Sequence, residues 1–329
     1  MSYRCCRAGL LLSVFLGSAM AQNDAPTQPS PSASGIASKG ESHAAEIMKR
    51  FPAPGQMIDI GGRRLHLFCK GDPQRPSLVI EGAAFASSYS YFKAQDEMAK
   101  VAQVCVYDRA GLGWSDQAPL PRPLEDRVDD LHRLLNSGPV RLPVILAGHS
   151  MGGLLVRMYE KKYPSEVAGL ILIESSNERA NATEEARKQV TRTAAQIGMA
   201  FPVLAAGGEI PQVRIPNGPP EQEIIQRESV FRAGQDDLLA MSGIDEELRK
   251  FGDLGTLGDK PLIVITRGKR DPGMSESMEK EWAESHRWLA TLSSRSTLVV
   301  AENSGHMVNF DRPDLLRDAT ERLLKLLGE

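Results

Sequence analysis

Residues 145–153 read I-L-A-G-H-S-M-G-G, and this stretch constrains the fold more than any other part of the chain. A continuous apolar run at 143–147 precedes the motif and predicts a strand buried on both faces of a parallel sheet. A helical pattern at 151–163 follows directly and ends before Pro164. The pattern G-x-S-x-G between a buried strand and a helix is typical of a serine held in a sharp strand-to-helix turn.

Such a turn would expose the hydroxyl of Ser150 above the sheet, in a strained backbone conformation. The chain would pass so close to itself that Gly148 and Gly152 have no room for side chains. The N-terminus of a helix also favours negative charge, through its unpaired N–H groups and its dipole. We therefore predict that Ser150 is a nucleophile, and that His149 serves packing or local hydrogen bonding.

A serine hydroxyl is a poor nucleophile unless a base removes its proton. In this kind of site the base is a late histidine, and an acid lies between serine and histidine in the chain. His306 fits, because its loop E-N-S-G-H lies between a predicted strand at 297–301 and the last predicted helix, Pro313–Leu327. Four other histidines lie in an early strand, in predicted helices or ahead of the folded domain: His66, His132, His286 and His43.

Two carboxylates are candidates for the acid that orients the base. Asp271 follows the predicted strand at 261–266, in G-K-R-D-P, and Glu174 follows the predicted strand Val167–Ile173. Either would lie at the carboxyl end of a parallel strand, where ligands bind in open α/β sheets. We favour Asp271 and keep Glu174 as the alternative.

An oxyanion hole needs two N–H donors directed at the developing negative charge. The backbone N–H of Met151, directly after the nucleophile, is expected to be one. The other is expected from the loop E-G-A-A-F-A-S-S, whose small residues let the backbone approach a ligand. We assign Ala84, with Ala83 as the near alternative.

From about residue 56 strands alternate with helices, which predicts one α/β domain whose mostly parallel sheet is covered by helices on both faces. Eight strands are expected, at 56–60, 63–69, 77–81, 103–108, 143–147, 167–173, 261–266 and 297–301. The alternation breaks at 175–259, where about 80 residues are inserted between two strands; such an insertion is often a lid or a binding element, with an inert helical decoration as the alternative.

The N-terminus predicts export. Arg4 and Arg7 precede an apolar stretch at 9–20 that is too short to span a bilayer, and Ala19-Met20-Ala21 has the small-x-small pattern of a cleavage site after Ala21. We expect a signal peptide at 1–21, a flexible linker at 22–45 and the folded domain at 46–329, in a periplasmic or secreted protein without a stable membrane span.

Composition argues against several classes of partner. With 39 basic and 42 acidic residues the net charge is −3, and no basic patch predicts nucleic-acid binding. No cluster with metal-ligand spacing and no glycine-rich phosphate loop is found, so no metal or cofactor is expected. The expected partner is a small-molecule substrate.

Several motifs together resemble the α/β-hydrolase superfamily over nearly all of residues 50–329. Y-D-R-A-G-L-G-W-S-D at 107–116 is similar to the segment after the family's fourth strand, G-H-S-M-G-G to its elbow, and G-K-R-D-P and S-G-H to its acid and base loops. The resemblance is to members with a serine triad and a helical cap after the sixth strand. It implies an eight-stranded, mostly parallel sheet.

One departure concerns the oxyanion loop. Many members of that family begin it with His-Gly, whereas this chain has Gly82-Ala83 preceded by Glu81, so the family motif does not assign the second donor here. The serine in the elbow argues against members that form an ester through aspartate, such as epoxide hydrolases and haloalkane dehalogenases.

The resemblance also implies a disulfide. The family's sheet order places its second and fourth strands side by side, about 5 Å apart, and Cys69 and Cys105 lie in these two strands. A disulfide is favoured in an exported protein. We predict a Cys69–Cys105 bridge, with two buried free thiols as the alternative.

The leading functional hypothesis is a carboxylic-ester hydrolase acting through an acyl-enzyme on Ser150. The same machinery also suits an amide, a lactone or a C–C bond beside a ketone. A non-catalytic binding protein on this fold is the alternative from a different class.

Overall fold

The protein is described by a computed structural model that covers residues 33–180, 184–211, 219–271 and 274–329, with the side chains of 33–38 left undescribed. The predicted signal peptide lies outside these ranges. The strands form one eight-stranded sheet in the order β1-β2-β4-β3-β5-β6-β7-β8. β1 and β2 are antiparallel, as are β2 and β4, and the other neighbours are parallel. The predicted α/β fold with a mostly parallel sheet is confirmed.

The strands lie close to the predicted positions. Their bounds are β1 Gln56–Asp59, β2 Arg64–Lys70, β3 Ser77–Glu81, β4 Gln103–Tyr107, β5 Val144–His149, β6 Val167–Ile173, β7 Leu262–Arg267 and β8 Ser296–Ala301.

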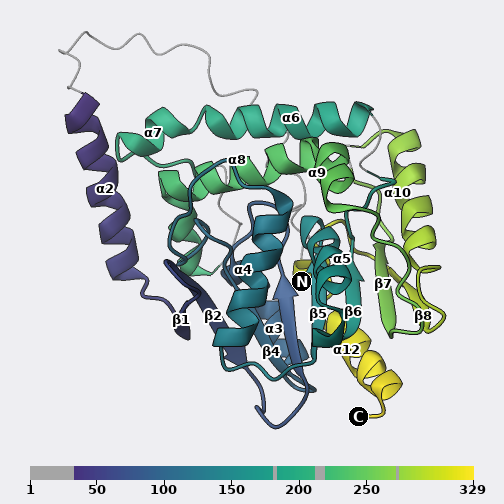
Figure 1. Ribbon diagram of the computed structural model, residues 1–329. Coiled ribbons are helices and arrows are strands. Elements are labelled where there is room, and N and C mark those ends of the chain that lie inside the picture. The colour runs from purple at the N-terminus through teal and green to yellow at the C-terminus, as the bar shows by residue number, and fades with distance from the viewer. Residues whose placement is uncertain (1–32, 181–183, 212–218, 272–273) are drawn as a thin grey trace, which may run out of the picture.

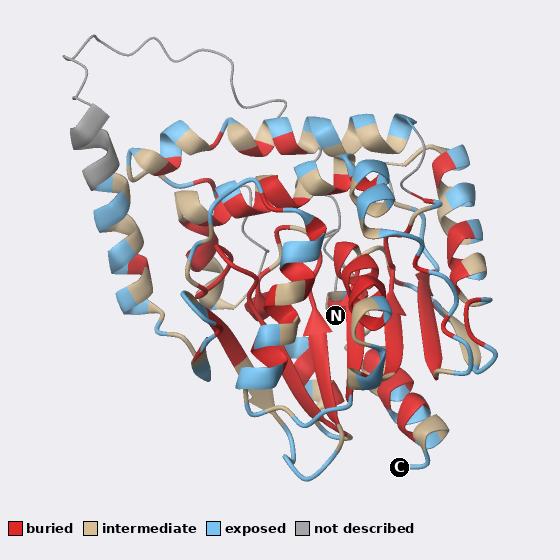
Figure 2. Ribbon diagram, viewed as in Figure 1, coloured by how far each residue is buried: buried red, intermediate tan, exposed pale blue. Residues whose placement is uncertain are grey.

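The central strands are mostly apolar and buried along nearly their whole length because each face of the sheet is covered (Figure 2). Successive side chains of a strand point to opposite faces. In β6, Leu170 and Leu172 enter one hydrophobic cluster, while Ile171 and Ile173 enter the other. An apolar run without alternation is therefore what a strand buried on both sides requires.

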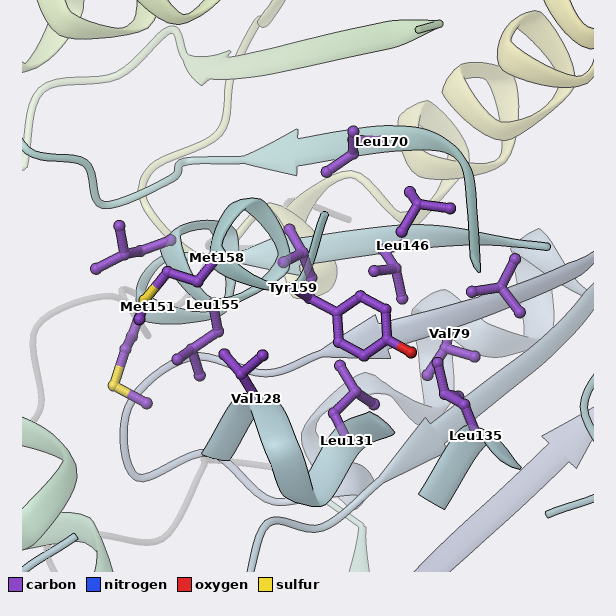
Figure 3. Packing of buried hydrophobic residues seen from close by; sticks show 14 of the residues in the cluster. Val79, Val128, Leu131, Leu135, Leu146, Met151, Leu155, Met158, Tyr159 and Leu170 are labelled. Atoms are coloured by element: carbon purple, nitrogen blue, oxygen red, sulfur yellow. The ribbon is translucent and has the colours of Figure 1, made fainter. Parts of the chain in front are cut away.

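One face of the sheet packs against α4 (Leu124–Ser137) and α5 (Met151–Lys162). Figure 3 shows Val128 and Leu131 of α4 opposite Leu155 of α5. Leu124, Val128, Leu131 and Leu135 recur at helical spacing and are all buried. These positions give α4 one apolar face, as in an amphipathic helix that covers a sheet.

The other face packs against α3 (Phe92–Met98) and α12 (Pro313–Leu327), preceded by the short α11 (Val308–Asp311). α10 (Glu276–Leu289) lies beside β7 and contributes Leu289 to the first cluster. Layers of helix, sheet and helix thus bury both sides of the strands.

Among the described residues between β6 and β7, the regular elements are helices. They are α6 Glu184–Gly198, α7 Phe201–Ala205, the 3₁₀ helix η4 Pro220–Gln226, α8 Glu228–Ser242 and α9 Ile244–Phe251. We call them the insertion helices. Figure 1 shows α6, α7 and α8 lying across one end of the sheet, the end toward which the parallel strands point.

The insertion helices have an apolar core of their own. Ile197 of α6, Leu204 of α7 and Phe231 of α8 are buried together with Phe85, which belongs to the loop after β3. The insertion is therefore packed onto that loop as well as onto itself.

The predicted flexible linker at 22–45 is wrong in its second half. α2 (Ala33–Arg50) is a helix, and a Cβ at Gly40 would lie 2.6 Å from the Ala205 carbonyl oxygen, so the helix touches α7 closely. Further along α2, Ile47 is buried among Trp114 and Ile224. The composition of this stretch predicted too little apolar surface for folding, but docking one helix face onto an existing domain requires much less.

Cys69 and Cys105 are directly opposite each other in β2 and β4, with Cα atoms 4.0 Å apart, and form a disulfide. The predicted bridge is confirmed. None of the helices in the described ranges is both long and apolar enough to cross a membrane.

Candidate active site

The sharp turn predicted at Ser150 is present. β5 ends at His149, α5 begins at Met151, and Ser150 between them has φ 54° and ψ −120°, which is unusual for a residue with a side chain. The two glycines are sterically required. A Cβ at Gly148 would lie 2.4 Å from the Gly152 carbonyl oxygen, and a Cβ at Gly152 would lie 2.2 Å from the Glu81 carbonyl oxygen.

Ser150 is partly exposed at the N-terminus of α5, and within the described ranges its hydroxyl makes no hydrogen bond. The Ser150 carbonyl accepts the N–H groups of Gly153 and Ser176, which fixes the backbone of the turn. A third glycine was missed by sequence reasoning: a Cβ at Gly153 would lie 2.0 Å from the Ser175 hydroxyl oxygen.

His306 lies beside this turn. The centre of its ring is 5.0 Å from that of His149, the neighbour of Ser150. Its Nδ1 lies 3.1 Å from Oε2 of Glu174, and its side chain is 24% exposed. Because a carboxylate only accepts, Nδ1 carries the hydrogen, which leaves the lone pair of a neutral ring on Nε2. The imidazole is therefore oriented to accept a proton through Nε2.

The carboxylate of Glu174 is fully buried and surrounded by donors. Besides His306 it accepts the Arg267 backbone N–H at 2.7 Å, the Arg267 guanidinium at 2.5 Å and the Trp282 indole N–H at 3.0 Å. Burial by itself would raise the pKa of Glu174, but the hydrogen bond and charge of His306, with the charge of Arg267, hold it well below the usual value. Glu174 is therefore ionised.

Of the two candidate acids, the structure places Glu174, the alternative, in contact with His306. Asp271 lies beyond the end of β7, where its backbone N–H donates to Glu279 of α10 at 2.6 Å. Glu174 has a positive φ of 45° directly after β6, and this turn keeps its carboxylate at the strand end. Strand order in the sequence could not distinguish the two candidates.

His149 is a hydrogen-bonding residue, as expected, and it connects two loops of the site. Its Nε2–H donates to the His306 carbonyl at 2.9 Å, and its Nδ1 accepts the Tyr91 hydroxyl at 2.9 Å. Burial, with a smaller contribution from nearby His306, lowers the pKa of His149 to about 3, so the ring is neutral. Sequence reasoning did not identify Tyr91, which has no motif around it.

In the loop after β3, the backbone N–H groups from Ala83 to Ala86 differ in whether they are already bonded. The Ala83 N–H donates to the Tyr91 hydroxyl at 2.8 Å, the Phe85 N–H to Asp237 at 3.1 Å, and the Ala86 N–H to the Ala83 carbonyl at 3.1 Å. In the part of the chain that the structure describes, the Ala84 N–H has no such partner, and Ala84 is partly exposed. Between the two alternatives, this geometry favours Ala84.

No group of three or more histidine, cysteine or carboxylate side chains within the described ranges is placed to hold a metal ion.

Comparison with known proteins agrees with this geometry. A profile of the alpha/beta hydrolase family matches residues 78–319. The chain belongs to the alpha/beta hydrolase family. This hydrolase is 23% identical to the uncharacterized protein YqjL of Bacillus subtilis over 73% of its own length and 80% of that protein. It is 27% identical to the (E)-2-((N-methylformamido)methylene)succinate hydrolase of Acinetobacter baylyi, over 80% of its own length and 95% of that enzyme.

Among solved structures, the hydrolase is similar to a putative lipase from Acinetobacter baumannii, with a TM-score of 0.65 and 17% identity. The match covers 92% of this chain and 99% of the lipase. At this identity the likeness supports the shared fold.

Proposed function

We propose that this hydrolase cleaves carboxylic esters through an acyl-enzyme on Ser150, with His306 as base and Glu174 as the acid that orients it. The observation that carries the proposal is the contact between His306 and the buried, ionised Glu174, beside a serine in the strained turn between β5 and α5. A base, an orienting carboxylate and an exposed hydroxyl are the three components that acyl transfer by serine requires.

In the proposed reaction, the Ser150 oxygen attacks the ester carbonyl carbon while Nε2 of His306 takes the hydroxyl proton. The negative charge on the carbonyl oxygen is stabilised by the N–H groups of Met151 and Ala84. The C–O bond to the alcohol then breaks, and His306 returns the proton to the departing alcohol. Water then attacks the carbonyl carbon of the acyl-enzyme while His306 takes its proton. The bond to Ser150 breaks, Ser150 regains its proton from His306, and the carboxylic acid leaves. Throughout, Glu174 stays ionised and stabilises the imidazolium.

An ester is the first substrate class to test, because Ser150, His306 and Glu174 supply the groups that acyl transfer needs and a structural neighbour is described as a putative lipase. Amides are the second substrate class to test, because one relative is the (E)-2-((N-methylformamido)methylene)succinate hydrolase. Lactones and C–C bonds beside a ketone are further bonds that the same three groups are suited to cleave. The alternative from a different class is a non-catalytic binding protein.

The test compares the wild-type protein with Ser150→Ala on p-nitrophenyl esters of increasing acyl length and with a fluorophosphonate probe. We expect the wild type to hydrolyse short esters and to take up one probe molecule, and Ser150→Ala to lose both. Ser277→Ala, an exposed serine of α10, is the control and should keep both. A protein that neither turns over esters nor reacts with the probe would contradict the proposal and favour a binding role.

We also propose that the protein is exported and that the signal peptide is removed after Ala21. The Cys69–Cys105 disulfide supports this, because such bonds persist in oxidising compartments. N-terminal sequencing of protein from the periplasm or medium should begin at Gln22. Recovery of the chain in the cytoplasm with an intact Met1 would contradict export.

A further inference from the structure

Arg109, from the loop after β4, contacts the backbone of the loop that carries Ala84. Its guanidinium is buried and donates to the Gly82 carbonyl at 2.8 Å and to the Ala83 carbonyl at 2.6 Å. It is held in place by two carboxylates, Glu81 at 2.5 Å and Asp237 at 2.7 Å. A planar guanidinium can satisfy several acceptors in a fixed arrangement, which an ammonium group cannot do.

The contact with the Ala83 carbonyl determines where the Ala84 N–H points. The two groups belong to one peptide unit, which is planar and trans, so they point in opposite directions. Because Arg109 binds the Ala83 carbonyl, the Ala84 N–H points away from the guanidinium, toward the opposite side of the loop. The neighbouring peptide is held in the same way, since Arg109 binds its carbonyl and Tyr91 accepts its N–H.

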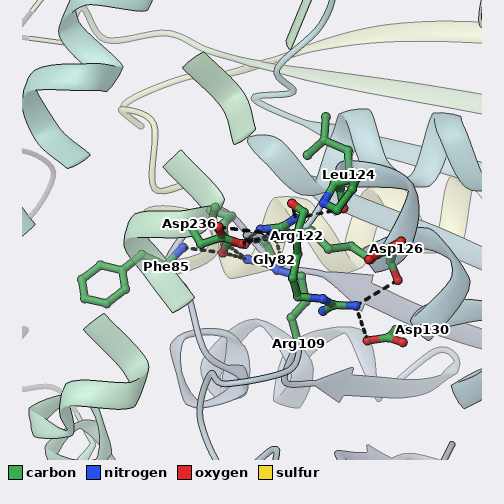
Figure 4. Close-up of polar contacts among 12 residues, drawn as sticks. Gly82, Phe85, Arg109, Arg122, Leu124, Asp126, Asp130 and Asp236 are labelled. Atoms are coloured by element: carbon green, nitrogen blue, oxygen red, sulfur yellow. Dashed lines mark hydrogen bonds and ion pairs between the residues drawn. The ribbon is translucent and has the colours of Figure 1, made fainter. Parts of the chain in front are cut away.

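The same loop is attached to α8 of the insertion. Asp237 of α8 accepts the Phe85 N–H at 3.1 Å while it binds Arg109, and Figure 4 shows Phe85 beside the part of α8 that carries Asp236. The Phe85 ring packs so closely on Gly234 that a Cβ there would lie 1.9 Å from it. Phe85 has φ 63°, a conformation that costs a bulky residue free energy and persists only when its surroundings enforce it.

We propose that Arg109 and Asp237 are positioning residues for the oxyanion hole, which fix the direction of the Ala84 N–H and make it depend on the placement of α8. This inference rests on the proposed esterase function. It assigns the insertion a role in the chemical step, in addition to any role in covering the substrate: a shift of α8 moves Phe85 and Arg109, and with them the second oxyanion donor.

The first test displaces the loop without changing a charge. Gly234→Ala places a methyl group where the Phe85 ring now lies, so the ring must shift, and we expect it to displace the loop that carries it from α8. We expect kcat on a p-nitrophenyl ester to fall by about 10²-fold, the size of effect that a small misplacement of a catalytic group can have, with KM nearly unchanged. The control is Gly243→Ala at the end of α8, where the nearest atoms to an added Cβ are 3.7 and 3.8 Å away.

The second test removes the fixed arrangement of donors. Arg109→Lys keeps the positive charge beside Glu81 and Asp237, but one ammonium cannot hold two carbonyls and two carboxylates in the geometry observed. We expect kcat to fall by about 10²–10³-fold, as for the loss of one oxyanion donor. Melting temperature and circular dichroism establish whether each variant is folded. If Arg109→Lys does not fold, Gly234→Ala alone tests whether the loop position affects kcat.

A trifluoromethyl ketone separates positioning from a merely structural role, because its serine adduct places a negative oxygen in the oxyanion hole. We expect its affinity to fall in both variants by the factor lost in kcat/KM, while the affinity for the carboxylic acid product stays within about twofold. Folded variants that keep wild-type kcat and inhibitor affinity would overturn the positioning role and leave the esterase proposal intact. If the wild type has no Ser150-dependent activity, both proposals fail.

Discussion

At the scale of single residues, the proposed chemistry depends on the pairing of His306 with Glu174. Glu174 has no exposed surface and is bound by the guanidinium of Arg267, so it keeps its charge when a proton arrives on the imidazole. Asp271 is half-buried, and its backbone N–H donates to Glu279.

The first prediction separates these two carboxylates. Glu174→Gln should lower kcat by about 10³–10⁴-fold, because the amide neither stabilises the imidazolium nor favours the required tautomer. Asp271→Asn should change kcat less than about threefold. Both are checked by steady-state kinetics on one ester, and a severe loss in Asp271→Asn with an active Glu174→Gln would reverse our assignment.

The second prediction concerns pH and the buried His286 of α10. Burial lowers its pKa to about 4 from 6.5, so the folded protein keeps the ring neutral while the unfolded chain binds a proton below pH 6.5. Its contribution to stability is therefore complete above pH 6.5 and is lost as the pH falls toward 4. Between pH 7.5 and pH 5, this histidine should reduce the free energy of unfolding by about 2 kcal/mol.

Urea unfolding of the wild type and His286→Gln at several pH values checks this. The glutamine cannot titrate but can still donate to the Trp282 carbonyl, which accepts Nδ1–H of His286 at 3.0 Å. We expect a smaller loss of stability on acidification in the variant. Identical slopes in the two proteins would show that His286 does not carry the effect.

At the scale of elements, the turn between β5 and α5 depends on close backbone contact with β3. α5 begins immediately after Ser150, and Gly152 in its first turn faces the Glu81 carbonyl at the end of β3. The helix N-terminus, the serine and the loop after β3 can therefore lie this close together only because Gly152 has no side chain.

Gly152→Ala should separate these elements. The added methyl group would lie 2.2 Å from the Glu81 carbonyl oxygen, and backbone cannot move away as a flexible side chain can. We expect a loss of about 1–3 kcal/mol in the free energy of unfolding and a larger loss of kcat than in Gly243→Ala. Unfolding and kinetics measured on both variants check this, and a fully active Gly152→Ala would contradict the geometry.

At the scale of the whole molecule, the disulfide joins the antiparallel side of the sheet to its parallel centre. Cys69 and Cys105 are 36 residues apart and connect β2 with β4, neither of which carries Ser150, Glu174 or His306. The bond therefore concerns the stability of the domain more than its chemistry.

The double variant Cys69→Ser, Cys105→Ser should lose about 3–4 kcal/mol of unfolding free energy, the amount expected for closing a loop of this length. Its kcat at 25 °C should stay within about twofold of the wild type. Reduction with dithiothreitol should destabilise the wild type and leave the variant unchanged. Equal stability of the two oxidised proteins would show that the bond contributes nothing.

Much of the fold follows from the sequence because local patterns decide it. The strand Val167–Ile173 and the helix Pro313–Leu327 have the bounds predicted for them, since each is an apolar run or amphipathic repeat with clear breaks. The turn at Ser150 could be predicted for the same reason: glycines at 148 and 152, a strand before and a helix after are all local. His306 could be predicted from its place after β8.

Tertiary structure decided what depends on residues far apart in the chain. Whether Glu174 or Asp271 meets His306 depends on how two strand ends and the loop after β8 converge, and no local pattern encodes this. The helix at 33–50 forms against η4 and α7, whose surfaces the segment's own composition could not reveal. The ion pair between Asp237 and Arg109 joins residues 128 positions apart in the chain, and only packing brings these charges together.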